Sequence, residues 1–158
     1  MADTVARRAE PPARTRSAGV AGADATYTFA VARRPGDDRT AQQWARSVFE
    51  DAPAPMPTVL LLGWRTVLRL RSRPRTGPGH VLGWRIRADE GDLLVLEQDS
   101  GLIAARNVVQ VDGELVSWST TVEFAKPAAR LVWAVVLPFH LVTIPRLLAR
   151  AARRGGRA

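Results

Sequence analysis

The chain has 158 residues, a length that suits one domain able to bury about 70% of the surface it exposes when unfolded. It contains no cysteine, which excludes disulfides, thiolate metal sites and cysteine nucleophiles. With only His80 and His140 as histidines, a histidine-rich metal site is unsupported, and we expect neither a metal nor a cofactor. The formal net charge of +8 comes almost entirely from arginine. The absence of disulfides fits the reducing cytoplasm, where we expect the protein to reside.

The sequence divides into three parts. Residues 1–23 are rich in Ala, Arg, Pro and Gly and show no apolar periodicity, so we expect a disordered N-terminal arm. The arginines in this arm are not followed by the apolar segment that a secretory signal requires. Residues 24–153 carry the periodic apolar pattern of a folded domain, and residues 154–158 form a basic tail.

The first half of the domain predicts one strand and two short helices. Residues 25–31 alternate in polarity and are rich in residues that favour strands. Thr40 is placed to cap a helix over residues 41–50. Three prolines within residues 51–57 indicate a rigid connection, after which a second helix is predicted over residues 58–70.

Four strands are predicted next, because apolar alternation recurs between turn-forming residues. Asp112-Gly113 between two such runs is a strong hairpin signal. The pattern therefore indicates an antiparallel meander, with strands over residues 81–88, 92–98, 102–111 and 114–124.

The last predicted element is a long apolar helix over residues 128–153. Pro127 suits the first helical position, where no backbone hydrogen bond is lost. Pro138 and Pro145 lie inside the helix and each removes a backbone bond, so we expect them to kink or split it.

This order of elements resembles the START-like superfamily (SRPBCC, helix-grip), and more locally an uncharacterised bacterial branch of it, a domain of unknown function. The resemblance rests on four stretches: Trp44–Glu50, Val81–Ile86, Ser119–Val122 and Pro138–His140. It implies an α+β fold in which a curved antiparallel sheet wraps on the long C-terminal helix, with two short helices after strand 1. It also implies a small hydrophobic or amphipathic ligand between sheet and helix. The final helix departs from the pattern, because Leu137, Leu141 and Val142 make it unusually apolar.

Alternation along the strands selects the side chains that would line such a pocket. In the strand over residues 81–88, Trp84 shares a face with Leu82 and Ile86. In the strand over residues 114–124, one face carries Trp118 and Thr120 among apolar neighbours. The opposite face of that strand is expected to meet water with Ser117, Ser119, Thr121 and Glu123.

The final helix contributes a stripe that includes Trp133 and His140. The candidate ligand-binding residues are therefore Trp84, Trp118, Thr120, Trp133 and His140, which would give an apolar pocket with a few polar points. A simpler alternative is that these side chains only fill the core, and the sequence leaves both readings open.

The sequence offers no catalytic signature. His140 could act as a general acid or base, but no carboxylate lies three or four positions from it on the helix. Gly77-Pro78-Gly79 lacks the following Lys-Ser/Thr of a phosphate-binding loop, and the serines lack a Gly-x-Ser-x-Gly setting. We assign no catalytic residue, and a cyclase or hydrolase that uses His140 is kept as the less favoured alternative.

Two further partners are open alternatives. The apolar run over residues 131–145 is followed by several arginines, which is typical of a helix that lies on an anionic membrane surface or serves as an interaction module. A basic patch with Trp64 could bind nucleic acid, although a solvated helix end explains it more simply. Its arginines are Arg65, Arg69, Arg71, Arg73 and Arg75. The identity of the ligand and the oligomeric state do not follow from the sequence.

Overall fold

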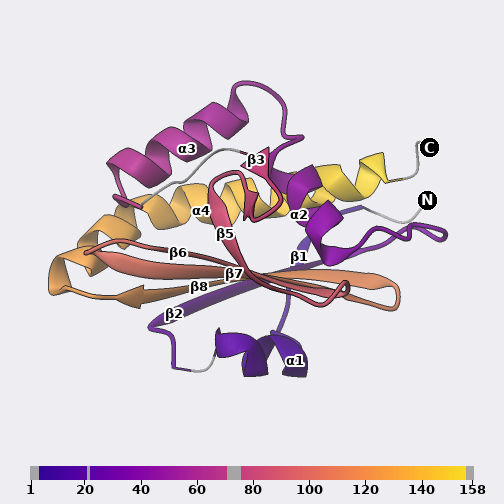
Figure 1. The fold of residues 1–158 in the computed structure, drawn as a ribbon, viewed down its shortest axis with the longest axis horizontal. Coiled ribbons are helices and arrows are strands. Elements are labelled where there is room, and N and C mark those ends of the chain that lie inside the picture. Colours follow the sequence, from indigo (N-terminus) through magenta and orange to yellow (C-terminus); the bar gives the residue numbers. More distant parts are fainter. Residues whose placement is uncertain (1–3, 21, 71–75, 156–158) are drawn as a thin grey trace.

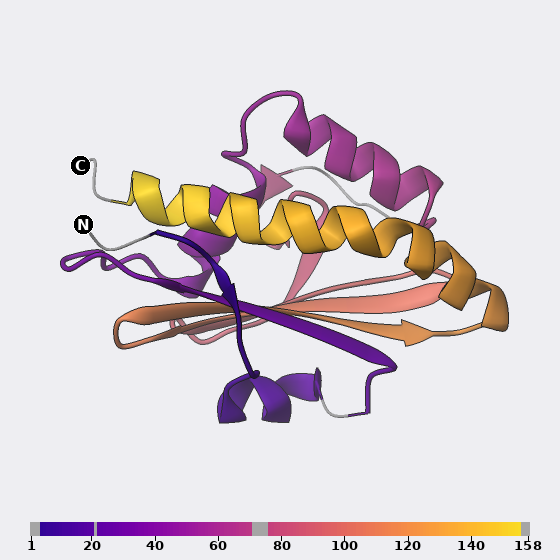
Figure 2. The same cartoon turned by 180° about the vertical axis from the view of Figure 1, so that it is seen from behind.

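The computed structural model describes residues 4–20, 22–70 and 76–155. These residues form an antiparallel sheet covered on one face by a long C-terminal helix, which confirms the predicted α+β class (Figures 1 and 2). The strands are β1 (Arg7–Arg8), β2 (Ala25–Ala32), β3 (Thr76–Gly77), β4 (His80–Val81), β5 (Trp84–Asp89), β6 (Leu93–Asp99), β7 (Ile103–Asp112) and β8 (Leu115–Phe124). The helices are α1 (Ala13–Thr15), η1 (Arg16–Val20), α2 (Ala41–Phe49), α3 (Met56–Thr66) and α4 (Pro127–Arg154).

Within the described ranges the sheet has eight strands in the order β1-β2-β8-β7-β6-β5-β4-β3. The predicted meander accounts for β5 to β8, and the first long strand, β2, pairs with the last, β8. The order of elements, with two short helices after β2 and a long helix across the sheet, is consistent with a helix-grip topology.

Helix α2 begins where its cap predicts. The hydroxyl of Thr40 accepts a hydrogen bond from the backbone N–H of Gln43, and the Gln43 side chain accepts one from the backbone N–H of Thr40. This reciprocal cap satisfies two donors that the first turn would otherwise leave free. The helix then buries Trp44, Val48 and Phe49 against the sheet.

The predicted strand over residues 81–88 is two strands joined by a tight turn. Leu82 and Gly83 have φ values of 44° and 84° and connect β4 to β5, so that Val81 pairs with Trp84. Positive φ at both central residues gives the twist that a two-residue hairpin needs, and glycine adopts it freely at the second position. Leu82 therefore lies in a turn and does not share a strand face with Trp84.

Helix α4 is continuous from Pro127 to Arg154, so the prolines do not split it. It bends near its N-terminal end, where it turns away from β8 before running along the sheet (Figure 2). Trp133, Ile144 and Leu148 are buried on its inner side, and this packing holds the helix together across Pro138 and Pro145.

The arm predicted to be disordered over residues 1–23 differs from the structure, in which residues 7–8 and 13–20 form β1, α1 and η1. Residues 1–3 and 21 lie outside the described ranges. Helix α1 lies on the face of the sheet opposite α4 (Figure 1). There the buried Thr15 hydroxyl donates to the Gln110 side chain at 2.9 Å, and Arg14 forms ion pairs with Glu90 and Asp92.

This cover explains a second difference from the prediction. Ser117, Ser119 and Thr121 were expected to face water and are instead buried, whereas Glu123 is exposed as expected. The face they occupy also carries a small apolar cluster against which Ala18 packs, made of Leu93, Val95 and Val108. A polar segment thus gains order because it shields a sheet face that is partly apolar.

The cover can be tested with a charge placed at the contact. Ala18→Asp puts a carboxylate against the apolar cluster, and we expect it to lower the free energy of unfolding by about 1–3 kcal/mol. Ser17→Asp adds the same charge at the neighbouring exposed position and should change the free energy of unfolding by less than about 0.5 kcal/mol. Urea unfolding of both variants measures the difference, and equal effects would show that the segment does not pack on the sheet.

Candidate functional site

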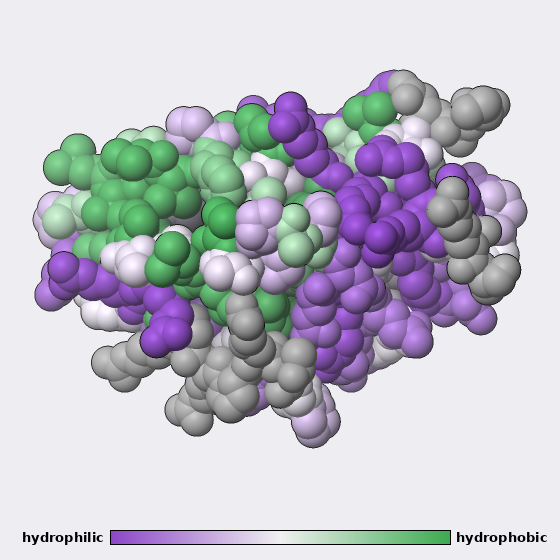
Figure 3. Space-filling model, turned by 90° about the horizontal axis from the view of Figure 1, so that it is seen from above, coloured by the Kyte–Doolittle hydropathy of each residue, from purple (hydrophilic) through white to green (hydrophobic). Residues whose placement is uncertain are grey.

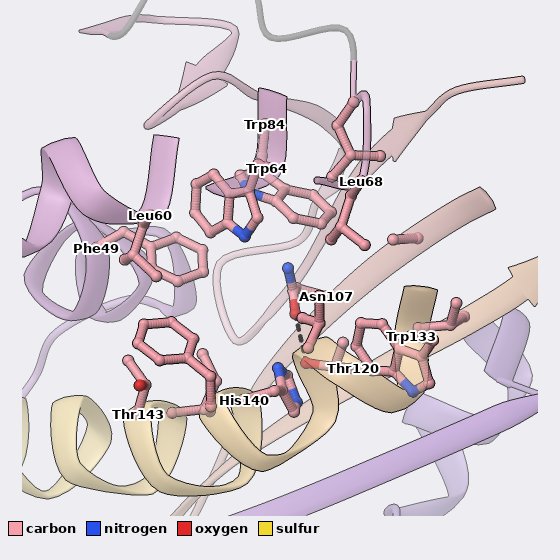
Figure 4. Close-up of a pocket in the computed structure, with 16 residues that line it drawn as sticks. Phe49, Leu60, Trp64, Leu68, Trp84, Asn107, Thr120, Trp133, His140 and Thr143 are labelled. Carbon is pink, nitrogen blue, oxygen red and sulfur yellow. Dashed lines mark hydrogen bonds between the residues drawn. The ribbon is translucent and has the colours of Figure 1, made fainter. Parts of the chain in front are cut away.

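A small cavity lies between the sheet, α3 and α4, with a volume of about 50 Å³ (Figure 4). It is lined mainly by apolar and aromatic side chains, with a few polar groups among them. The sheet and α2 contribute Phe49, Trp84, Ala105, Asn107, Thr120 and Val122. Helix α3, the residues that follow it and helix α4 contribute Leu60, Trp64, Leu68, Leu70, Trp133, Val136, Phe139, His140, Thr143 and Ile144.

Four of the five candidate residues from the sequence meet at this cavity. Trp84 and Thr120 lie on the sheet side, and Trp133 and His140 lie on α4. Trp118 does not line the cavity: it is completely buried behind the wall, with its ring 4.9 Å from that of Phe49. Trp118 thus supports the site from behind.

Asn107 is a polar lining residue that the sequence reasoning missed. It stands between Ala105 and Val109 on β7, and a single amide on an otherwise apolar strand face is the signal that could have identified it. Its Oδ1 accepts hydrogen bonds from Trp118 Nε1 at 3.0 Å and from Thr120 Oγ1 at 2.6 Å. Because an indole N–H can only donate, the acceptor must be the amide oxygen. The amide nitrogen is directed toward the indoles of Trp64 and Trp84 (Figure 4).

The position of Trp64 also differs from the one expected from the sequence. It was grouped with a basic patch, but in the structure its ring lies 5.2 Å from Phe49 and 5.4 Å from Trp84, at the cavity. Arg65 and Arg69 are exposed, and residues 71–75 of the proposed patch lie outside the described ranges. Trp64 therefore forms part of the cavity wall.

Two buried nitrogens at the cavity have no hydrogen-bond partner among the described residues. They are Nε1 of Trp84 and Nε2 of His140. An unpaired buried donor costs about 1–3 kcal/mol, so such groups are uncommon in folded proteins. Trp84, Asn107 and His140 thus place polar groups among the apolar side chains that line the cavity.

His140 sits in an aromatic setting without a carboxylate. Its ring is 5.7 Å from that of Tyr27 and 5.6 Å from that of Trp133, and the Trp133 indole donates to the Tyr27 hydroxyl. Burial lowers the pKa of His140 to about 4, so the imidazole is neutral near pH 7. Among the described lining residues there is no Asp or Glu to orient it or to stabilise its protonated form.

The described part of the chain contains no group of three or more His, Cys, Asp or Glu side chains placed to hold a metal ion. The described residues that line the cavity present a few hydrogen-bonding groups on a largely apolar and aromatic surface.

The low pKa of His140 makes a prediction about stability. In the window between about pH 6.5 and pH 4 the unfolded chain binds a proton at this residue and the folded protein does not, so the free energy of unfolding falls as pH falls. The loss reaches about 2 kcal/mol at about pH 5. Urea unfolding at about pH 7.5 and about pH 5 should show a drop that is smaller in His140→Phe by this amount. Equal drops in both proteins would mean that the histidine is accessible to protons when folded.

Comparison with protein-family models, with curated proteins and with solved structures found no match to this chain. The function must therefore be argued from the site itself.

Proposed function

We propose that this protein is a START-like, helix-grip domain of the cytoplasm that binds a small apolar molecule carrying a hydrogen-bond acceptor. The observation that carries the proposal is the convergence of two donors on one apolar cavity. Trp84 Nε1–H has no acceptor among the described residues, and the amide of Asn107 is held by Trp118 and Thr120 so that its nitrogen is directed toward the indoles of Trp64 and Trp84. A carbonyl or ether oxygen of a ligand would satisfy these donors.

The order of elements supports the membership of the superfamily. Strand β2, two short helices, a run of antiparallel strands and α4 follow one another as the resemblance implies. The site also lies where that resemblance expects a ligand, between the sheet and the last helix.

The size of the cavity limits what can bind without movement. Ligand pockets commonly have volumes of about 300–1,000 Å³, well above that of the closed cavity. Helix α3 is the wall that can give way, because within it only Leu60 and Leu61 are buried, whereas α4 buries Ala129 and Trp133 near its start and seven residues over 143–152. We propose that α3 shifts outward when a ligand enters.

The geometry does not favour a cyclase or hydrolase that uses His140. A general base becomes protonated when it accepts a proton, so the site must stabilise that protonated form. His140 is buried and has no carboxylate beside it among the described lining residues, which disfavours the protonated imidazole. We therefore propose binding without an assigned catalytic role.

Paired probes of matched shape test the proposal. Acetophenone carries the acceptor oxygen, and ethylbenzene has a similar size and lacks it. We expect both to raise the thermal midpoint and quench tryptophan fluorescence, with the ketone bound more tightly. Trp84→Phe should weaken ketone binding by about five- to tenfold, which corresponds to the loss of one hydrogen bond. The affinity for ethylbenzene should change by less than about twofold.

Trp44→Phe is the matched control. Trp44 Nε1 is also buried without a partner among the described residues, but Trp44 does not line the cavity, so this variant should bind both probes as the wild type does. If neither probe, nor a fatty acid or a sterol, changes the fluorescence or the thermal midpoint, the proposal fails. If Trp84→Phe weakens both probes equally, the acceptor part of it fails.

A further inference from the structure

The outer surface of α3 and α4 carries nearly all the exposed large hydrophobic residues of the described chain, with Val5 and Leu115 as the exceptions. We call this surface the α3–α4 face; it consists of Val59, Leu62, Val67, Leu131, Val135, Phe139 and Val142. Figure 3 shows hydrophobic residues gathered over this half of the molecule, while the other half is hydrophilic. Leu131 and Val135 are 74% and 77% exposed, values that place them fully in solvent. A contiguous apolar surface of this kind is typical of an interaction site.

The composition of α4 adds a second observation. Its most apolar 18-residue window has a mean hydropathy of 1.8, enough by length and composition to cross a membrane, yet only 28% of that window is buried. The core helix of a soluble domain would be mostly buried. Trp133, Ile144 and Leu148 are buried on the inner side of α4, and the exposed large hydrophobic residues of this helix lie over residues 131–142. Such a helix can lie in the plane of a bilayer surface.

The charge of the two helices selects among partners. Neither α3 nor α4 contains an Asp or Glu, and together they contain six arginines: Arg65, Arg130, Arg146, Arg150, Arg153 and Arg154. Arg65 and Arg146 are exposed. A second copy of the chain docked on the same face would bring arginines toward arginines without an acidic residue on either pair of helices. Anionic lipid headgroups complement this charge, and the acyl region accepts the apolar side chains.

We propose that the α3–α4 face docks on the surface of an anionic bilayer, with Leu131 and Val135 inserted and Arg65 and Arg146 paired with lipid headgroups. The protein binds the membrane peripherally, with α4 still packed on its own sheet. This inference uses the outer face of the helices and does not depend on what the cavity binds.

Co-sedimentation with vesicles tests the docking surface. The full chain should sediment with vesicles of phosphatidylcholine and phosphatidylglycerol and bind far less to phosphatidylcholine alone. Leu131→Gln combined with Val135→Gln keeps every charge and should lower the partition coefficient at least tenfold, because the apolar insertion is lost. Leu115→Gln removes an exposed hydrophobic residue outside this face and should change it less than twofold. Arg65→Gln combined with Arg146→Gln should lower binding to the anionic vesicles by about fivefold per arginine.

Four outcomes would overturn the inference. One is the absence of sedimentation with either vesicle, and another is a Leu131→Gln/Val135→Gln variant that binds as the wild type does. A dimer in solution that this variant dissociates would identify a second copy as the occupant of the face. Protein that resists extraction from vesicles by alkaline carbonate would show that α4 spans the bilayer. Circular dichroism and thermal unfolding of each variant verify that it is folded, and none of the readouts requires a cavity ligand.

Discussion

The packing of α4 along the sheet is the constraint on which the rest of the structure depends. The pairing of β2 with β8 places the first and last long strands side by side, and α4 leaves β8 to return across them. At its far end the helix is held by Arg39, which donates to the carbonyl of Ala151, pairs with Asp37 and stacks over the ring of Trp44. These contacts tie α4 to α2 and to the loop before it.

Hydrogen bonding within the core explains why the site is polar at a few points and apolar elsewhere. The side-chain oxygen of Asn107 accepts hydrogen bonds from both Trp118 and Thr120. The buried amide is therefore tolerated and its orientation is fixed. Trp84 and His140 receive no such compensation from the described residues. Both residues line the cavity, which is one of the observations behind the proposed binding role, and buried atoms unpaired among the described residues also occur away from it, at Trp44, His80, Gln98 and Ser117.

Much of the fold could be predicted because local signals and tertiary packing agree. The capping box at Thr40, the Asp112-Gly113 turn and the alternation along β8 each report a structure that neighbouring residues alone favour. Prediction failed where a distant segment decides the outcome. Residues 4–20 hold too few apolar side chains to fold by themselves, and they are ordered by a sheet face more than 70 residues away in sequence. For the same reason Ser119 was expected in water, although that segment covers its face.

The site residues also fall into those that local patterns predict and those that depend on tertiary packing. Period-two and helical patterns brought Trp84, Thr120, Trp133 and His140 to one cavity, because alternation fixes which face of an element a side chain occupies. They could not show that Trp118 stands one layer deeper, since alternation gives the face and not the depth. Nor could they reveal Trp64, whose position depends on how α3 sits above the sheet.

Two opposed demands on α4 account for its unusual composition. Its inner side must fill the core and leave a cavity, which requires Trp133, Ile144 and Leu148 together with a polar point at His140. Its outer side has no packing partner within the described chain and would normally be polar, as on an amphipathic surface helix. It carries Leu131 and Val135 instead, two exposed apolar side chains of the kind that mark interaction surfaces. Phe139 belongs to both sides, because it lines the cavity and is 45% exposed. A helix that is apolar on both sides and carries only basic charges is what the proposed docking requires, with one side on the sheet and the other on lipid.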